Sequence, residues 1–164
     1  MIRERAIRLA EERNHLDLRP QPPQEVHRDE AARAVRYDAE TTIAVIDLDG
    51  LKRINDTLGH PEGDRAIRDA AEVIRASFRD SDVVARLGGD EFAVLVRNDP
   101  TYGGDAATAV EVAAARLREA VARHNATAER PYELSLSLGF SGYDPAAPQP
   151  IESLLDAADP VPTA

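Results

Sequence analysis

The chain has 164 residues, 43% of them hydrophobic, which favours one globular domain with its own core and short extensions. Thirty acidic residues against twenty basic ones give a formal net charge of −10, so most of the surface would repel a nucleic acid polymer or an anionic membrane. The absence of cysteine excludes disulfides and thiolate metal sites, and the absence of a long apolar stretch or a signal-peptide core leads us to expect a cytoplasmic protein without direct membrane insertion.

Residues 1–40 are predicted to form an extension that precedes the domain. Residues 2–14 place apolar side chains along one helical stripe among Arg and Glu, which is typical of a short amphipathic helix. The stretch 18–24 contains three prolines and indicates a stiff linker, because proline removes a backbone donor and fixes φ. A second short helix is expected at 28–37.

The predicted domain spans residues 41–159 and is followed by a short tail at 160–164. Its first strand, at 41–48, is a nearly continuous run of β-branched and aliphatic residues, which is typical of a strand buried on both faces. Helical periodicity follows at 67–78, and the same periodicity at 106–121 predicts a second long helix.

A hairpin is expected between these two helices. Strands at 83–87 and 91–96 flank Gly88-Gly89, and a two-residue turn favours glycine because it needs positive φ. A last strand at 134–140 alternates between apolar and small or polar residues, which predicts one covered face. The order strand, helix, strand, strand, helix, strand is that of a split βαβ, ferredoxin-like or palm-type sheet. We therefore expect an α+β domain, an α/β sandwich with a mainly antiparallel sheet and flanking helices packed on one side.

Four carboxylates are expected to converge at one edge of this sheet. Asp47 and Asp49 end the first strand. Asp90 and Glu91 begin the returning strand of the hairpin, which lies beside the first strand in a split βαβ sheet. Anions in a partly desolvated cleft repel one another unless a cation compensates, and oxygen ligands without Cys or clustered His suit a hard ion. The pattern predicts a Mg²⁺ (or Mn²⁺) site that binds substrate phosphates.

Three other interpretations of these acids were weighed. A calcium loop fails, because Leu51 and Lys52 stand where that loop needs an acid or amide and then a glycine. A haloacid-dehalogenase-type phosphatase also begins with an apolar strand and Asp-x-Asp-Gly, but Leu51 departs from its usual Thr or Val and the remaining elements are not a parallel βαβ series. Solvated acids at strand ends would explain either pair alone better than they explain two neighbouring pairs.

Three motifs connect the chain to a known family. The first, at 46–64, reads IDLDGLKRINDTLGHPEGD; the second, at 79–96, reads RDSDVVARLGGDEFAVLV; the third, at 134–140, reads LSLSLGF. In this order they resemble the GGDEF domains, diguanylate cyclases that join two GTP molecules into cyclic di-GMP, over about residues 41–159. The resemblance implies this activity in a symmetric homodimer, in which each half presents one GTP and two pyrophosphates are released.

The resemblance also implies a role for each acid of the two motifs. Asp47, the backbone carbonyl of Leu48, and Asp90 match the positions that hold the metal ions. Glu91 matches the second acidic signature residue, which either binds the second ion or deprotonates the attacking ribose 3′-hydroxyl. Carboxylate and carbonyl oxygens are hard ligands, in keeping with magnesium.

Five residues match the family's substrate-binding positions. The backbone N–H groups of Gly50 and Leu51, together with Lys52, resemble its phosphate-binding turn, although Phe is usual at position 51. Asn55 and Asp64 match the positions that read guanine. A carboxylate accepts from both the N1–H and the 2-amino group of guanine, whereas adenine offers no such donor pair. Helix capping is the simpler explanation of Asn55 and Asp64, and their fit to the family spacing weakens it.

Arg79 and Asp82 match the family's inhibitory RxxD site for cyclic di-GMP. Five residues separate this motif from Gly88, as in the family. Arg can bind a guanine edge or a phosphate in a forked geometry while Asp accepts from the base. In so charged a chain, an ion pair at a helix end is the alternative.

Two departures from the family leave a second function open. The family's usual opening, D-x-L-T-x-L-x-N-R-R, is not recognisable in residues 1–40. At the other end, residues 154–159 resemble the start of the family's last helix, but Pro160 stops it, so the Lys and Arg that reach the terminal phosphates are missing. The alternative is a catalytically impaired GGDEF module that binds GTP or cyclic di-GMP and signals through partners.

Overall fold

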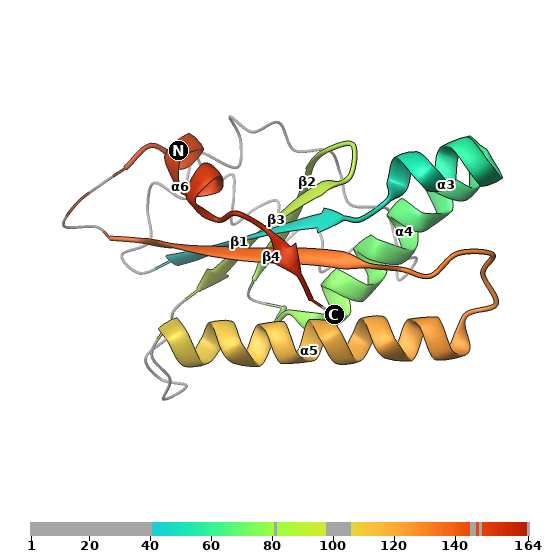
Figure 1. Ribbon diagram of the computed structural model, residues 1–164. Coiled ribbons are helices and arrows are strands. Elements are labelled where there is room, and N and C mark those ends of the chain that lie inside the picture. The colour runs from blue at the N-terminus through green and yellow to red at the C-terminus, as the bar shows by residue number, and fades with distance from the viewer. Residues whose placement is uncertain (1–40, 81, 98–105, 145–146, 148, 164) are drawn as a thin grey trace, which may run out of the picture.

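The computed structural model describes residues 41–80, 82–97, 106–144, 147 and 149–163. They form a five-stranded sheet with strand order β2-β3-β1-β4-β5, in which neighbouring strands are antiparallel (Figure 1). The expected α+β fold is confirmed; the helices and linker predicted at 2–14, 18–24 and 28–37 lie outside the described residues. The strands are β1 (Thr41–Leu48), β2 (Val83–Gly88), β3 (Glu91–Arg97), β4 (Leu136–Tyr143) and β5 (Val161–Pro162), and the helices are α3 (Leu51–Leu58), α4 (His60–Ser77), α5 (Ala106–Thr127) and α6 (Ile151–Ala157).

Strand β1 lies at the centre of the sheet, between β3 and β4. Ala44, Ile46 and Leu48 belong to the larger buried cluster, whereas Ile43 and Val45 belong to a second cluster on the opposite face. Successive side chains of a strand point to opposite faces, so β1 contributes to both. The prediction of a strand buried on both sides is confirmed, and this explains why its sequence does not alternate with polar residues.

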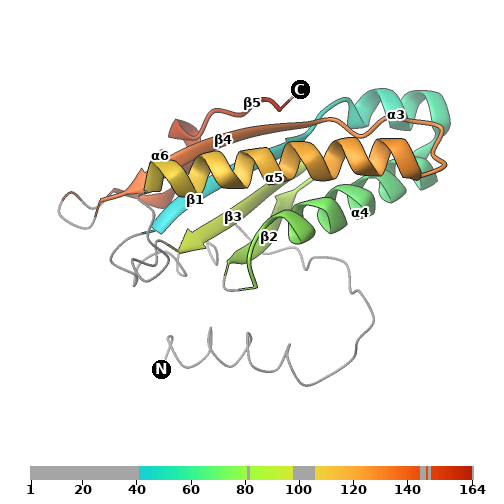
Figure 2. The same ribbon diagram turned by 90° about the horizontal axis from the view of Figure 1, so that it is seen from below.

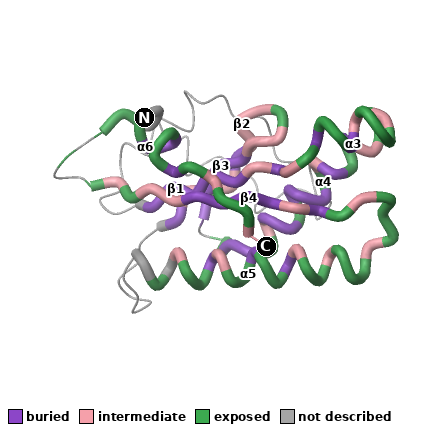
Figure 3. The backbone as a smooth tube through the Cα atoms, viewed as in Figure 1, coloured by how far each residue is buried: buried purple, intermediate pink, exposed green. Residues whose placement is uncertain are grey.

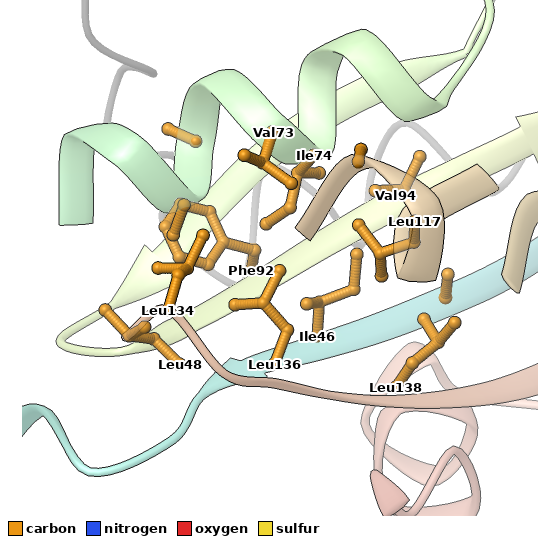
Figure 4. Close-up of a cluster of buried hydrophobic side chains, with 14 of the residues drawn as sticks. Ile46, Leu48, Val73, Ile74, Phe92, Val94, Leu117, Leu134, Leu136 and Leu138 are labelled. Carbon is orange, nitrogen blue, oxygen red and sulfur yellow. The ribbon is translucent and has the colours of Figure 1, made fainter. Parts of the chain in front are cut away.

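Helices α4 and α5 cover one face of the sheet and form the larger core (Figure 2). Ile74 of α4, Leu117 of α5, Phe92 of β3 and Leu136 of β4 meet there with almost no exposed surface (Figure 4). Full burial of side chains of this size stabilises the fold by roughly 1.5–3 kcal/mol each. Both predicted long helices are thus confirmed as the helices that pack on the sheet.

Helix α6 covers the other face of the sheet (Figure 1), although the sequence predicted helices on one side only. Leu154, Leu155 and Ala158 belong to the second cluster. Gly139 of β4 allows this approach, because a Cβ atom at that position would overlap the backbone carbonyl of Ala158. The expectations that helices pack on one side only and that β4 has one covered face are therefore wrong, because the small residues of β4 make room for a backbone.

The segment after α6 belongs to the sheet. Helix α6 ends at Ala157, before Pro160, as the sequence predicted. Val161 and Pro162 then form β5, which pairs with Ser137 and Leu138 of β4. Residues 161–162 and the following Thr163, whose backbone N–H donates to the carbonyl of Leu136 at 3.0 Å, are therefore part of the domain and not a separate tail.

The hairpin turn differs from the prediction by one residue. Gly88 pairs with Glu91, so the two turn residues are Gly89 and Asp90 instead of Gly88-Gly89. Both glycines have positive φ, 144° and 54°, and the register shifts between Arg86 and Gly88. Gly88 is therefore the last residue of β2, next to this register shift, and does not belong to the turn. The Arg86 guanidinium donates to the carbonyl of Gly89 at 2.8 and 3.1 Å, which fixes the turn.

A buried carboxylate ties α4 to α5 and to the loop before β4. Asp69 is 5% exposed and accepts hydrogen bonds from the Nε of Arg130 and the hydroxyl of Tyr132, both at 2.7 Å. The Nε2 of His124 lies 3.4 Å from the same oxygen. Burial alone would raise the pKa of Asp69, but the bonds from Arg130 and Tyr132 outweigh it and the pKa is lowered.

Burial is concentrated in the strands and on the sheet-facing sides of the helices, whereas the outer side of α5 is exposed (Figure 3). Helix α5 therefore has one face in the core and one in water, as its periodicity predicted. Within the described ranges, no helix combines the length and apolar character needed to cross a bilayer.

Candidate functional site

The acidic residues of the two motifs meet where β1 ends. Asp47 of β1 is paired with Glu91, the first residue of β3. The next backbone N–H of β1, that of Leu48, donates to the carbonyl of Asp90 at 2.9 Å. The antiparallel register thus places the end of β1 against the hairpin turn, and three of the predicted carboxylates lie along this edge.

The charge of this edge is unfavourable without a cation. Burial, followed by the neighbouring Asp90, Asp49 and Glu91, raises the pKa of Asp47 from 3.8 to about 6. All three neighbours act in the same direction, because each is an acid that disfavours another negative charge. A divalent cation among these groups would reverse the effect, so this concentration of negative charge fits a metal site.

The donor set also fits a hard divalent cation. Asp47, Asp90, Glu91 and the carbonyl of Leu48 offer oxygen ligands only, as Mg²⁺ and Mn²⁺ prefer. Across the residues that the structure describes, no three His, Cys, Asp or Glu side chains are already gathered closely enough to hold an ion.

Asp49 is the exception among the four predicted acids. Its two carboxylate oxygens accept hydrogen bonds from the hydroxyls of Ser135 and Ser137, each at 2.7 Å. Asp49 is close enough to raise the pKa of Asp47, but its side chain is bound to the β4 side. Asp49 therefore lies at the predicted acidic edge, and β4 and the segment before it supply the hydrogen-bond donors to its carboxylate. Sequence reasoning missed the two serines, although their alternation opposite the leucines of 134–138 was visible.

Helix α3 begins directly beside the acids. Gly50 precedes it with a left-handed φ of 72°, and no side chain among the described residues caps this N-terminus. Leu51 is buried, which anchors the first turn, while Lys52 is exposed. The first N–H groups of a helix have no partner within the helix and attract anions. The predicted phosphate-binding turn is thus placed next to the predicted metal ligands.

The two predicted guanine-reading residues lie at the junction of α3 and α4. The side chain of Asn55 packs against Gly63, where a Cβ atom would overlap its amide. Asp64 follows Gly63 in α4 and is exposed. The connection between the helices is Gly59, whose φ of 90° permits the sharp turn. Asn55 and Asp64 are therefore close together at this junction.

The predicted inhibitory pair occupies the opposite end of the hairpin. The backbone N–H of Arg79 donates to the Asp82 carboxylate at 2.9 Å, and the N–H of Asp82 donates back to the carbonyl of Arg79 at 3.0 Å. Both residues line a hollow that is open to solvent and that also includes Arg116 of α5. Sequence reasoning missed Arg116, because α5 is distant in the chain. Strand β2 separates this hollow from the acids by roughly 20 Å, at about 3.3 Å per residue.

The sequence matches one protein family over most of its length. Residues 24–161 match the family described as diguanylate cyclase, GGDEF domain. A relative, diguanylate cyclase TpbB of Pseudomonas aeruginosa (strain UCBPP-PA14), is 34% identical over 91% of this chain and 34% of its own length. The bifunctional diguanylate cyclase/cyclic di-GMP phosphodiesterase MucR of P. aeruginosa (strain PAO1) is 38% identical over 67% of this chain. The chain spans only 15% of MucR, so these relatives are much longer proteins.

Solved structures show the same fold. The GGDEF domain of TpbB from P. aeruginosa has a TM-score of 0.66 and 31% identity, covering 85% of this chain and 83% of that one. The GGDEF domain of DgcB from Caulobacter crescentus, solved in complex with cyclic di-GMP, has a TM-score of 0.65 and 27% identity, with 88% of each chain covered. With both sequence motifs placed on this fold, the chain belongs to the GGDEF domain family of diguanylate cyclases.

Proposed function

We propose that this protein is a diguanylate cyclase that condenses two GTP molecules into cyclic di-GMP and releases two pyrophosphates. The observation that carries the proposal is the acidic edge with the raised pKa of Asp47, placed beside the uncapped start of α3 in a GGDEF domain. A triphosphate with its metal needs oxygen ligands and N–H donors next to each other, and these two elements supply both. GTP is a cytoplasmic metabolite, so the proposed activity belongs in the cytoplasm.

The reacting groups follow from this placement. Asp47, Asp90 and the carbonyl of Leu48 would hold Mg²⁺ or Mn²⁺, with Glu91 available for a second ion. When bound, the cation supplies positive charge against the α-phosphate. The ribose 3′-hydroxyl of one GTP forms a bond to the α-phosphorus of the other, and the bond to the β-phosphate oxygen breaks. In the alternative role of Glu91, its carboxylate takes the proton of that hydroxyl.

The remaining site residues bind and select the nucleotide. The N–H groups of Gly50 and Leu51, with the exposed Lys52, bind phosphate oxygens. Asn55 and Asp64 read the guanine edge at the junction of α3 and α4. Their separation from the acids along α3 matches a nucleotide that extends from its phosphates to its base.

Catalysis requires two copies of the chain. One site holds one GTP, and its 3′-hydroxyl needs the α-phosphate of a second GTP that is bound elsewhere. A symmetric homodimer satisfies both halves of the reaction with identical sites.

The hollow formed by Arg79 and Asp82 is proposed to bind the product and inhibit the enzyme. On a chain of net charge −10 a dianionic ligand needs local cations, and Arg116 lies in the same hollow. Strand β2 separates this hollow from the acids. A bound product therefore acts on the relative orientation of the two domains of the homodimer and does not occupy the GTP site.

A second candidate function is favoured by one observation. Residues 131–164 contain no Lys or Arg, so α6 and β5 bring no cation to the terminal phosphates of GTP. Loss of such contacts weakens binding of a triphosphate, with partial compensation by Mg²⁺. The chain would then be a module that binds GTP or cyclic di-GMP and signals through partners without turnover.

One experiment distinguishes the two. Purified protein is incubated with GTP and Mg²⁺, and the nucleotides are separated and identified by mass. Cyclic di-GMP from the wild type and none from Asp90→Ala supports the cyclase; Asp156→Ala, which removes an exposed acid of α6 outside both proposed sites, is the matched control. GTP or cyclic di-GMP binding with no product from the wild type supports the binding module. Equal turnover in Asp90→Ala would remove the proposed site.

A further inference from the structure

Asp49 stands among the acids of the site but is engaged by β4. Ser135 donates to one of its carboxylate oxygens and Ser137 to the other, and its backbone N–H donates to the carbonyl of Ser135 at 3.0 Å. Three hydrogen bonds therefore join this one residue to two alternate residues of the neighbouring chain segment. Each carboxylate oxygen of Asp49 therefore already has a hydrogen-bond donor from Ser135 or Ser137.

These three hydrogen bonds, here called the Asp49 clamp, act on a turn that joins two parts of the proposed site. Asp49 lies between Leu48, whose carbonyl is assigned to the metal, and Gly50, whose N–H is assigned to phosphate. On one side the N–H of Leu48 is held by the carbonyl of Asp90. On the other, no side chain of the residues that the structure describes caps the left-handed turn at Gly50. Asp49 is thus the side chain that fixes the turn between β1 and α3 to the sheet.

Helix α5 holds the chain segment that carries the two serines. The backbone N–H and carbonyl of Leu134 exchange two hydrogen bonds of 2.8 Å with the amide side chain of Asn125, near the end of α5. Ser137 is buried, and Ser135 is half-buried. The bonds to Leu134 and the burial of Ser137 therefore restrict where the two serines lie. Serines held in this way can fix the position of Asp49, which a freely rotating surface serine could not.

We infer that Asp49 is a positioning residue, and that its clamp by Ser135 and Ser137 holds the turn at residues 48–51 in the geometry that the reaction requires. The inference rests on the proposed function for its catalytic consequence. Asp49 does not touch the reacting atoms and is not assigned as a metal ligand. The hydroxyls of Ser137, on β4, and of Ser135, directly before it, thereby become determinants of turnover.

The test removes the hydroxyls and keeps the charge. In Ser135→Ala/Ser137→Ala the carboxylate of Asp49 remains, so a change in charge cannot explain the result. Ser135→Thr/Ser137→Thr restores a hydroxyl at both positions, and Ser153→Ala removes an exposed serine on α6 as the matched control. The single alanine variants serve if the double variant unfolds.

The first readout is independent of catalysis. Amide hydrogen exchange is measured on peptides that cover residues 48–54, with and without Mg²⁺. We expect exchange in this segment to be at least about tenfold faster in the alanine variant, with recovery in the threonine variant and no change in Ser153→Ala. Unchanged exchange in the alanine variant overturns the clamp, whatever the activity of the protein.

The second readout addresses the proposed function. We expect the alanine variant to lose about tenfold to a hundredfold in kcat, with a much smaller change in KM, because a displaced turn misaligns bound phosphates without removing ligands. If the wild type makes no product, the proposed activity fails while the exchange result still decides the clamp. Faster exchange with unchanged kcat in an active protein overturns the positioning role.

Discussion

The negative charge of Asp47 at the acidic edge lowers the stability of the fold, whereas the proposed metal site needs that charge. Asp47 has a raised pKa because burial and three acids disfavour its charge, so its ionised form weakens the fold that contains it. A group that destabilises the folded state and lies at the end of a buried strand is a feature of a site and not of a core.

Removal of that charge should therefore separate stability from metal binding. We expect Asp47→Asn to melt at the same temperature as the wild type or higher without metal, and to lose any stabilisation by Mg²⁺ or Mn²⁺. Thermal melts with and without each ion measure both effects, and the exposed Asp80→Asn is the control. A wild type that gains nothing from either ion, alone or with GTP, would contradict the site.

Asp64 should decide the choice of base. Asp64→Ser replaces two carboxylate acceptors by one hydroxyl, so we expect discrimination between GTP and ATP to fall by at least about tenfold. Competition between the two nucleotides for binding in the presence of Mg²⁺ measures this ratio. Asp56, exposed on α3, supplies the matched substitution Asp56→Ser. An unchanged preference for GTP in Asp64→Ser would remove the assignment.

Helices and strands show which parts of the fold a sequence can reveal. The β1 run and the periodicity of α5 predicted their elements correctly, because burial on two faces or on one stripe leaves a direct pattern. The packing of α6 over Gly139 left no such pattern in the sequence, since small and polar residues at 135, 137 and 139 resemble a solvated face. Only the structure shows that two of them bind Asp49 and that the third admits the backbone of α6.

The contact at Gly139 makes a prediction for the element it supports. Gly139→Ala should lower stability by about 1–3 kcal/mol, because its Cβ would overlap a backbone carbonyl of the α6–β5 segment, which must shift. Gly142→Ala, on the same strand with open space around it, should change stability by much less. Denaturant unfolding measures the difference. Equal stability of the two variants would show that α6 adapts without cost.

The network around Asp69 makes the packing of α4 against α5 dependent on pH. Its folded-state pKa is lowered, so its contribution is fully present above the unfolded pKa of about 3.9 and is lost as the pH falls through the lower folded value. We expect Asp69→Asn to be less stable than the wild type by about 2 kcal/mol at pH 7. The difference should shrink below about pH 4.

Denaturant unfolding of both proteins from pH 7 to pH 2.5 tests this. Arg65→Ala, which breaks an exposed pair with Glu62, should cost less than about 1 kcal/mol and is the control. A difference between wild type and Asp69→Asn that stays constant down to the lowest pH would mean that Asp69 is not the acid-sensitive group.

At the scale of the whole molecule, the two predicted sites lie at opposite ends of the β2–β3 hairpin. The resemblance to the family supplied the predicted residues of both sites. It predicted neither this separation nor the position of Arg116, because the sheet register and the packing of α5 define them. A ligand in the hollow of Arg79 and Asp82 therefore leaves the acidic edge accessible.

Arg79→Ala should accordingly weaken cyclic di-GMP binding by about tenfold or more, while GTP binding with Mg²⁺ stays unchanged. A forked contact from Arg to an anion is worth roughly 1.5–3 kcal/mol, and the chain has a net charge of −10 against the ligand. Calorimetry with each nucleotide on the wild type, Arg79→Ala and the exposed Arg68→Ala measures this. Equal cyclic di-GMP affinity in all three would leave Arg79 and Asp82 as a helix-end turn alone.

Strand β5 limits how copies of this protein can associate through the edge of the sheet. It covers part of β4 with only two residues, and the second is Pro162, which has no N–H to donate. A further strand that approached this side would find one donor missing, so the sheet is not a template for continued pairing there. In the proposed homodimer, two nucleotide sites can therefore face each other without the competing risk that the two sheets join at this edge.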